Sequence, residues 1–336
     1  MKQMVAYTHM LEFMPLRESR VSGLFLCMDG LVYVYSPLLF KYLTNDLDFF
    51  LGIAITLNIT ALTMMVGVLR VPESLKWHLT KGHIGAFWRA YEVVRHVNNA
   101  PENPRLREMV GILEAEKRGE KNIKIKQGGT FSELRKMRKY GLVIFNLILM
   151  FFAWTSMSFG VNLLTFYTKY LPGDTFNNSL VIGLGSFTFL LAGPLASCLS
   201  SRRILPLAYL LALSGALSLY FSAPLCAEMP CQQYMPALAL LARCGFNLAQ
   251  CFIFIIHTEL FPTFFLATSY GLCSSVARCV TMAAPLVAES ADRQVPLAFM
   301  AGACFLGGLA TLLIRKIDKE KDEREGADDL FNTSVI

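Results

Sequence analysis

One uncharged run decides the fold class: residues 141–168 read GLVIFNLILMFFAWTSMSFGVNLLTFYT. An α-helix rises 1.5 Å per residue, so about 20 apolar residues cross the roughly 30 Å hydrocarbon core of a bilayer. These 28 residues contain no Asp, Glu, Lys or Arg, and they exceed that length. The run therefore predicts a membrane-spanning helix.

Further apolar runs of spanning length lie on both sides of it. We expect spanning helices at about 21–43, 47–69, 180–200, 204–222, 234–258, 264–288 and 296–314. The composition agrees, because only 17% of the 336 residues are charged and 54% are apolar, whereas soluble domains carry about 25% charged residues. The sequence thus predicts an all-α, polytopic membrane protein with about eight spanning helices.

Basic residues are distributed unevenly between the loops. The polar segment 70–140 holds 16 Lys and Arg, whereas the loops on the opposite side hold only Lys41, Lys169 and Arg293. Basic loops stay in the cytosol, so we expect both termini and segment 70–140 to be cytoplasmic, with the plasma membrane as the host membrane. The basic excess is interpreted as topology, and no nucleic-acid partner is expected.

Four parts follow from this pattern. Residues 1–69 are expected to end an N-terminal half, 70–140 to form a cytoplasmic helical loop with helical pieces near 84–97 and 103–118, 141–315 to form a six-helix half, and 316–336 to form a tail. An internal repeat supports two related halves. Residues 11–15 (LEFMP), followed by Gly23, resemble residues 259–262 (ELFP), followed by Gly271. Transporters built from two related halves repeat junctions in this way.

Three stretches carry a resemblance to a known family. They are EFMPLRESR at 12–20, PESLKWHLTKG at 72–82, and ELFPT with GLCSSVAR within 259–278. With them the sequence resembles the organic cation/anion transporter family of the major facilitator superfamily. The family has twelve spanning helices, and this chain is similar to the last eight. The resemblance therefore implies a major-facilitator-type bundle that is incomplete at the N-terminus, with the rest of an N-terminal half as a missing partner.

Arg278 is the first candidate for substrate binding. A charge at mid-membrane costs about 2.5–3.5 kcal/mol on insertion scales, so it needs a polar surrounding. Ser274, Arg278 and Thr281 share one helical face. The resemblance implies that Arg at this position accompanies anion and zwitterion carriers, whereas Asp accompanies cation carriers. The alternative is an Arg that only pairs with a neighbouring helix.

Two further polar faces complete the candidate site. Arg243, Asn247 and Gln250 recur at helical spacing, and such residues rarely face lipid. Asn247 and Gln250 can bind a substrate or join helices, whereas Arg243 favours a structural role. Asn162 lies on a third polar face, beside Trp154, which can stack on an organic ion or lie in an aromatic belt.

Charges near the cytoplasmic side form a second group. Glu12, Arg17, Arg20 and Glu259 lie at the two repeated junctions, where the resemblance implies a gating or structural latch. Asp29 lies about 12 Å into the first predicted span at helical rise. It can bind a proton or join a structural ion pair.

Several chemistries have no motif in the sequence. There is no phosphate-binding Gly-x-x-x-x-Gly-Lys-Ser/Thr loop, His-Glu-x-x-His pair or Gly-x-Ser-x-Gly elbow. We therefore expect no enzyme, cofactor or metal. The sequence predicts a secondary transporter of small organic ions, anions or zwitterions, working by alternating access in the lipid bilayer. The alternatives are a truncated or non-transporting relative, and a membrane scaffold or receptor that uses the cytoplasmic loop.

Overall fold

The computed structural model describes residues 19–43, 46–64, 141–225, 234–261 and 263–315, together with parts of 72–111. The chain forms two compact units, one within Arg17–Thr44 and Gly128–Asp328 and the other containing Asn45–Gln127. The regular elements of the described residues are all helices.

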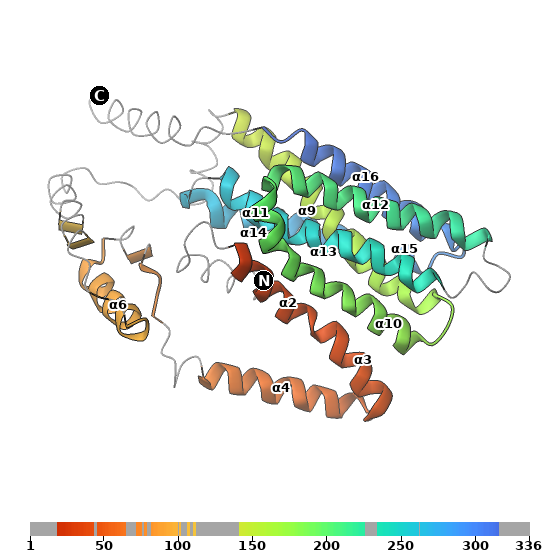
Figure 1. The fold of residues 1–336 in the computed structure, drawn as a ribbon, viewed down its shortest axis with the longest axis horizontal. Helices are drawn as coiled ribbons and strands as arrows, with labels where there is room; N and C mark the ends of the chain where they lie inside the picture. The colour runs from red at the N-terminus through yellow and green to blue at the C-terminus, as the bar shows by residue number, and fades with distance from the viewer. Residues whose placement is uncertain are drawn as a thin grey trace. The chain divides into compact units, whose positions relative to one another are not determined.

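The larger unit contains six helical segments that are long and apolar enough to cross a membrane (Figure 1). The elements are α9 (Gly141–Tyr167), η3 (Thr168–Tyr170), α10 (Thr175–Leu184), η4 (Gly185–Leu191), α11 (Ala192–Cys198), α12 (Ser201–Leu225), α13 (Met235–Leu260), α14 (Thr263–Thr281), α15 (Ala284–Ala288) and α16 (Gln294–Leu312). These segments coincide with the last six predicted spans, with α10, η4 and α11 forming one of them.

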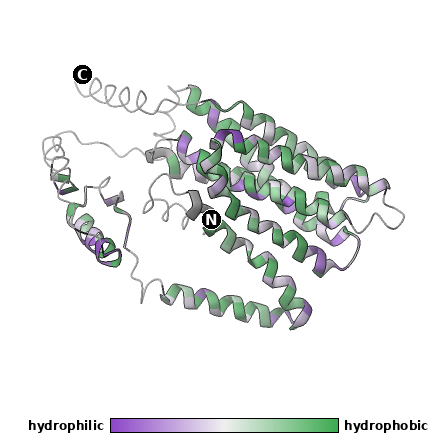
Figure 2. Ribbon diagram, in the orientation of Figure 1, coloured by the Kyte–Doolittle hydropathy of each residue, from purple (hydrophilic) through white to green (hydrophobic). Residues whose placement is uncertain are grey.

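Apolar residues extend along the whole length of these helices (Figure 2). Many large apolar side chains face outward, among them Leu210, Phe221 and Leu286. A helix that is apolar on all sides needs lipid or protein around it, and a helix satisfies its own backbone hydrogen bonds there. The larger unit is therefore an all-α, multi-pass membrane bundle.

Helices α12 and α13 approach each other closely at two glycines. A Cβ atom on Gly245 would lie 2.6 Å from the Cα of Ala212, and one on Gly215 would lie 2.7 Å from the Cα of Ala242. Small residues permit this approach and increase the packing contacts that hold helices together in lipid. In addition, the Tyr209 hydroxyl of α12 donates a 2.6 Å hydrogen bond to the carbonyl oxygen of Ala153 in α9.

The first predicted span, 21–43, consists of two consecutive helices and not of one continuous helix. It consists of α2 (Ser19–Gly30) and α3 (Val32–Tyr42) with a turn at Leu31. Pro37 lies within α3 and has no N–H to donate to the Tyr33 carbonyl. That carbonyl lies against Gly183 of α10, where a Cβ would be 2.8 Å from the Tyr33 carbonyl carbon. The absence of a side chain at Gly183 thus lets α3 pack closely on α10.

The smaller unit contains α4 (Leu47–Thr63) and α6 (Ile84–Val97). The predicted span 47–69 corresponds to α4, whose described length of 17 residues falls just short of a full crossing. The Asp46 carboxylate caps its N-terminus by accepting a 3.0 Å hydrogen bond from the N–H of Asp48. α6 covers the first of the two helical pieces predicted within the loop, 84–97, whereas most of the second, 103–118, lies outside the described residues.

Candidate substrate site

Helices α9, α13 and α14 meet around one aromatic cluster, which fixes their register. The Trp154 ring of α9 lies 5.0 Å from that of Phe254 in α13 and 5.8 Å from that of Tyr270 in α14. Farther along α9, Thr165 accepts a 3.3 Å hydrogen bond from Arg243 of α13. Numbers rise along α9 as they fall along α13, so the two helices are antiparallel.

The same register places three predicted site residues at one level. His257 of α13 contacts Ser269 of α14, and Phe254, three residues earlier, accepts a hydrogen bond from Tyr270, one residue later. Numbers therefore fall along α13 as they rise along α14, so these helices are antiparallel and α14 runs parallel to α9. Asn162 and Arg278 each lie eight residues beyond the aromatic contact, and Asn247 lies seven residues from it in the same direction. At 1.5 Å per residue this is about 12 Å along each helix.

Arg278 lies on the open side of α14. Its neighbours Cys273 and Ala277 are buried against the bundle, whereas Arg278 itself is exposed and Ser274 is half-buried. Within the part of the chain that the structure describes, the Arg278 guanidinium makes no ion pair and no hydrogen bond. Thr281 was predicted to lie on the same helical face as Arg278. Its hydroxyl donates a 2.7 Å hydrogen bond to the Ala277 carbonyl.

Asn162 lies on an open stripe of α9. The stripe continues through Ser158, which is half-buried, and Thr165, which is exposed. The Asn162 amide donates a 2.8 Å hydrogen bond to the Ser158 carbonyl one turn earlier, and its amide oxygen faces no described donor within the bundle. The predicted polar stripe of α9 is therefore accessible from outside the bundle.

Arg243 is buried and joins three helices. Its side chain is 3% exposed, donates to Thr165 and to the Val161 carbonyl at 3.5 Å, and lies 4.7 Å from the Tyr33 ring of α3. Gly185 of η4 makes room for it, because a Cβ there would lie 2.8 Å from the Arg243 Cγ. These contacts indicate a structural role for Arg243, which holds α13 against its neighbours.

The other predicted residues of α9 and α13 are less accessible. Asn247 is 1% exposed, and Gln250 is half-buried. Trp154 is 2% exposed and lies among Phe254, Tyr270 and His257, so no open ring face is available for stacking on an organic ion.

His257 is a buried polar residue that sequence reasoning did not select. Its ring stacks on Tyr270 at 4.0 Å, and its Nε2 lies 2.8 Å from the Ser269 hydroxyl. The Ser269 hydroxyl donates to the Leu266 carbonyl at 2.9 Å, which assigns the donor role to His257 Nε2. The sequence did offer one indication that His257 is buried. It lies three residues after Phe254 and four before Phe261, so it shares a helical face with two aromatic residues.

The predicted latch charges are only partly described. Glu259 is exposed and accepts a 3.3 Å hydrogen bond from the Ser201 hydroxyl at the start of α12. Glu12 and Arg17 lie outside the described residues, and so do the side chains of Arg20 and Asp29, whose backbones belong to α2.

Comparison with known protein families decides the identity of this bundle. The sequence profile of the Major Facilitator Superfamily matches residues 4–285, which is most of the chain. The chain belongs to the Major Facilitator Superfamily. No curated protein matches it at a significant level. Membership makes the chain a multi-pass secondary transporter of small molecules, in a family that is not one of enzymes.

Two ion pairs join helices of this Major Facilitator Superfamily bundle near the ends of α3 and α9. The Lys41 ammonium lies 2.7 Å from the Asp174 carboxylate and donates to the Asn177 amide oxygen at 2.7 Å. The Lys169 ammonium lies 2.8 Å from the Glu289 carboxylate. These bonds hold the pKa of both carboxyl groups below their usual values, chiefly through the bond from each lysine.

The lowered pKa values predict a pH dependence of stability. Because the folded carboxyls hold protons less tightly than unfolded ones, their contribution to stability is complete above their ordinary pKa values, 3.8 for Asp174 and 4.5 for Glu289, and is lost as the pH falls below these values. The effect should be small, since exposed ion pairs contribute little. We expect the melting temperature of the wild type to fall more steeply in this window than that of the Asp174→Asn/Glu289→Gln variant. Parallel curves in thermal unfolding by intrinsic fluorescence would contradict this.

Proposed function

We propose that this superfamily member transports small organic anions or zwitterions by alternating access, with Arg278 as the substrate-binding cation. The observation that carries the proposal is an exposed guanidinium, without an ion pair in the described residues, at the level of two amide side chains on neighbouring helices. A cation kept within an apolar span costs free energy. A negatively charged substrate offsets that cost when it binds.

The charge of Arg278 favours one class of substrate. In a site shielded from water, a positive charge attracts anions and repels cations more strongly than it does in bulk water. The planar guanidinium also presents two parallel N–H donors to a carboxylate. A carboxylate or a zwitterion that presents its carboxylate to Arg278 fits both requirements.

The neighbouring residues have different roles in this proposal. Ser274, Asn162 and Gln250 are at least partly accessible and supply hydrogen bonds to the polar part of the substrate. Asn247 and Trp154 are buried behind them and support the shape of the site, and Arg243 holds α13 against α3 and α9.

The resemblance to organic cation/anion transporters supports the same substrate class. With it we propose that α2–α4 belong to an N-terminal half, that 70–140 is a cytoplasmic loop, and that 141–315 is the second half. We also propose a location in the plasma membrane. The basic excess of 70–140 supports the sidedness.

Ligand-induced stabilisation tests the substrate class directly. The purified chain should melt at a higher temperature in the presence of an aromatic carboxylate than in its absence, because a ligand that binds only the folded state stabilises it. The matching amide and a quaternary ammonium compound of the same size are the controls. Equal stabilisation by the cation would refute the anion assignment, and uptake measurements in vesicles would then identify the true class.

Labelling of single cysteines tests the orientation. A cysteine placed at position 100 or position 330 should react with a membrane-impermeant maleimide only after permeabilisation, because the basic segments are expected in the cytosol. A cysteine in place of Asn177, which lies in the first turn of α10 and accepts a hydrogen bond from Lys41, should react without permeabilisation. Reaction of position 100 in sealed cells contradicts the topology.

A further inference from the structure

The segment between α4 and α9 is the most basic part of the chain. Residues 70–140 contain 16 Lys and Arg against eight Glu and no Asp, a net charge of +8, whereas the whole chain carries +6. Without this segment the chain would therefore be slightly acidic. An excess of this size next to a membrane helix needs an explanation beyond orientation alone, since few basic residues are enough to orient a loop.

Helix α6 within this segment has one buried and one exposed face. Phe87 and Ala90 are buried in the smaller unit, whereas Arg89, Val93 and Val97 are exposed at helical spacing. Val93 is 41% exposed and Val97 is 75% exposed. Exposed aliphatic side chains beside a cation are typical of a helix that lies in the interface between lipid headgroups and acyl chains.

The one acidic residue of α6, Glu92, does not cancel the positive charge of the exposed face. The Glu92 carboxylate forms a 2.7 Å ion pair with Arg95 one turn later on the same helix. Arg89 then carries the net charge of the exposed face. The face is thus basic and partly apolar.

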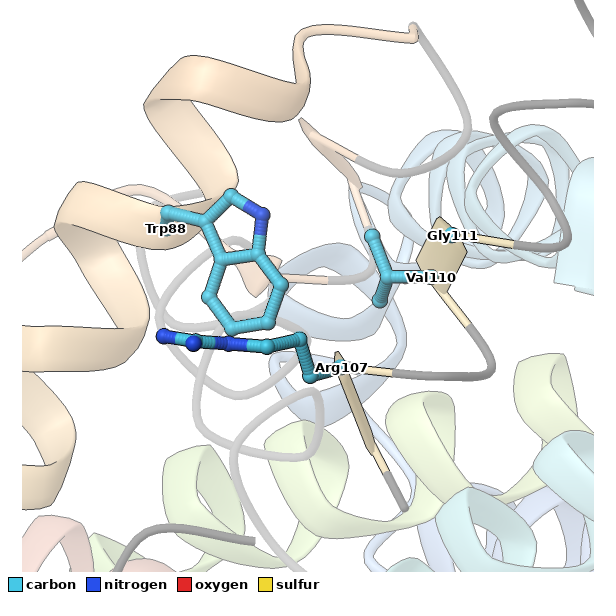
Figure 3. Close-up of a pocket in the computed structure, with 4 residues that line it drawn as sticks. All are labelled: Trp88, Arg107, Val110 and Gly111. Carbon is cyan, nitrogen blue, oxygen red and sulfur yellow. The ribbon is translucent and has the colours of Figure 1, made fainter. Parts of the chain in front are cut away.

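A second cationic group lies beside α6. The Arg107 guanidinium lies 5.9 Å from the Trp88 ring centroid (Figure 3). Trp88, Arg107, Val110 and Gly111 line an open cavity of about 380 Å³. An indole beside a guanidinium is suited to the headgroup region, where tryptophan places its apolar ring and its N–H in different surroundings.

Chain connectivity keeps α6 close to a bilayer. Helix α4 ends at Thr63, and α6 begins 21 residues later at Ile84. That connection spans at most about 70 Å even when fully extended. The anionic inner leaflet is therefore always within reach of α6, and its local concentration is far above that of any free partner.

From this charge, exposed face and tether, we propose that the segment 70–140 docks on the anionic lipid headgroups of the cytoplasmic leaflet through α6 and Arg107. Anionic lipids attract basic juxtamembrane segments within a Debye length of the surface. Arg89 and Arg107 contact lipid phosphates or carboxylates, and Val93 enters the interface. Val97 and Trp88, nine residues apart, lie on the two opposite flanks of this face, at the level of the headgroups. The proposal concerns the loop alone and is independent of the substrate that the chain carries.

Quenching of Trp88 fluorescence tests this docking. The full chain carries Trp77→Phe and Trp154→Phe, leaving Trp88 as its single tryptophan. The Trp154 N–H has no hydrogen-bond partner among the described residues, so phenylalanine removes no described hydrogen bond there and keeps an aromatic ring in the cluster. Reconstituted into bilayers of phosphatidylcholine with brominated acyl chains, Trp88 should be quenched more strongly, and emit at shorter wavelength, when phosphatidylserine is included. Salt at about 1 M, where the Debye length is about 3 Å, should remove the difference.

Charge reversal separates this proposal from its alternatives. Arg89→Glu/Arg107→Glu should abolish the phosphatidylserine-dependent quenching, whereas the matched pair Arg202→Glu/Arg203→Glu at the start of α12 should leave it unchanged. Equal quenching in pure phosphatidylcholine would overturn the proposal. So would the same spectral shift on adding inorganic phosphate to phosphatidylcholine bilayers, because this would assign the cavity to a small free anion.

Discussion

We expect Arg278→Asp to abolish the proposed uptake of organic anions and to leave the protein folded. The first half of this expectation rests on charge, because the substitution replaces the attractive guanidinium by a carboxylate that repels an anion in a low-dielectric site. The second half rests on exposure, because no described contact depends on the Arg278 guanidinium. A charged hydrogen bond contributes about 1.5–3 kcal/mol, so removing it alone weakens anion binding by about 10-fold to 150-fold.

The measurement is paired uptake of an organic carboxylate and an organic cation into vesicles that contain equal amounts of each variant. Arg278→Lys keeps the charge but loses the bidentate fork, so it should weaken carboxylate uptake without reversing the preference. Arg293→Asp provides a control with the same charge change near the start of α16, where the guanidinium stacks on Tyr170 at 3.8 Å. If Arg278→Asp and Arg293→Asp reduce anion uptake equally, Arg278 has no special role in binding.

The sequence predicted the spanning helices of the larger unit well, because twenty consecutive apolar residues have few alternatives to a membrane helix. It missed details that depend on single local bonds. The predicted span 180–200 begins earlier, at Thr175, because the Asp174 carboxylate accepts a 3.1 Å hydrogen bond from the N–H of Phe176 and caps the helix. A hydropathy window gives no weight to a capping residue.

The candidate site was predictable only in part. Helical spacing correctly grouped Asn162 with an open polar stripe of α9, but spacing cannot tell which neighbour a face meets. Trp154, one turn away from such residues, packs instead inside the aromatic cluster of α13 and α14. Arg243 contacts Tyr33, 210 positions earlier in the chain, and no pattern along one helix indicates that contact.

The packing of α12 on α13 predicts the largest effect on stability. Gly245→Val should prevent the accumulation of folded protein, because its Cβ would meet the backbone of Ala212 and lie 2.8 Å from the Ala208 carbonyl oxygen. Those atoms belong to the backbone of a helix and cannot rotate away. The helices would have to separate, and the close contacts that replace the hydrophobic effect between membrane helices would be lost. Even Gly245→Ala should lower the melting temperature markedly, since overpacking costs about 1–3 kcal/mol.

Gly302 of α16 supplies the matched control, because a Cβ there would meet no atom within 4 Å. Alanine is the better helix former by about 0.8–1 kcal/mol in water, so Gly302→Ala should leave the melting temperature unchanged or raise it. The readouts are the monodisperse fraction in gel filtration and the midpoint of thermal unfolding, compared at equal expression. A Gly245→Val protein that elutes and melts like the Gly302→Ala protein would show that α12 and α13 do not approach through this glycine.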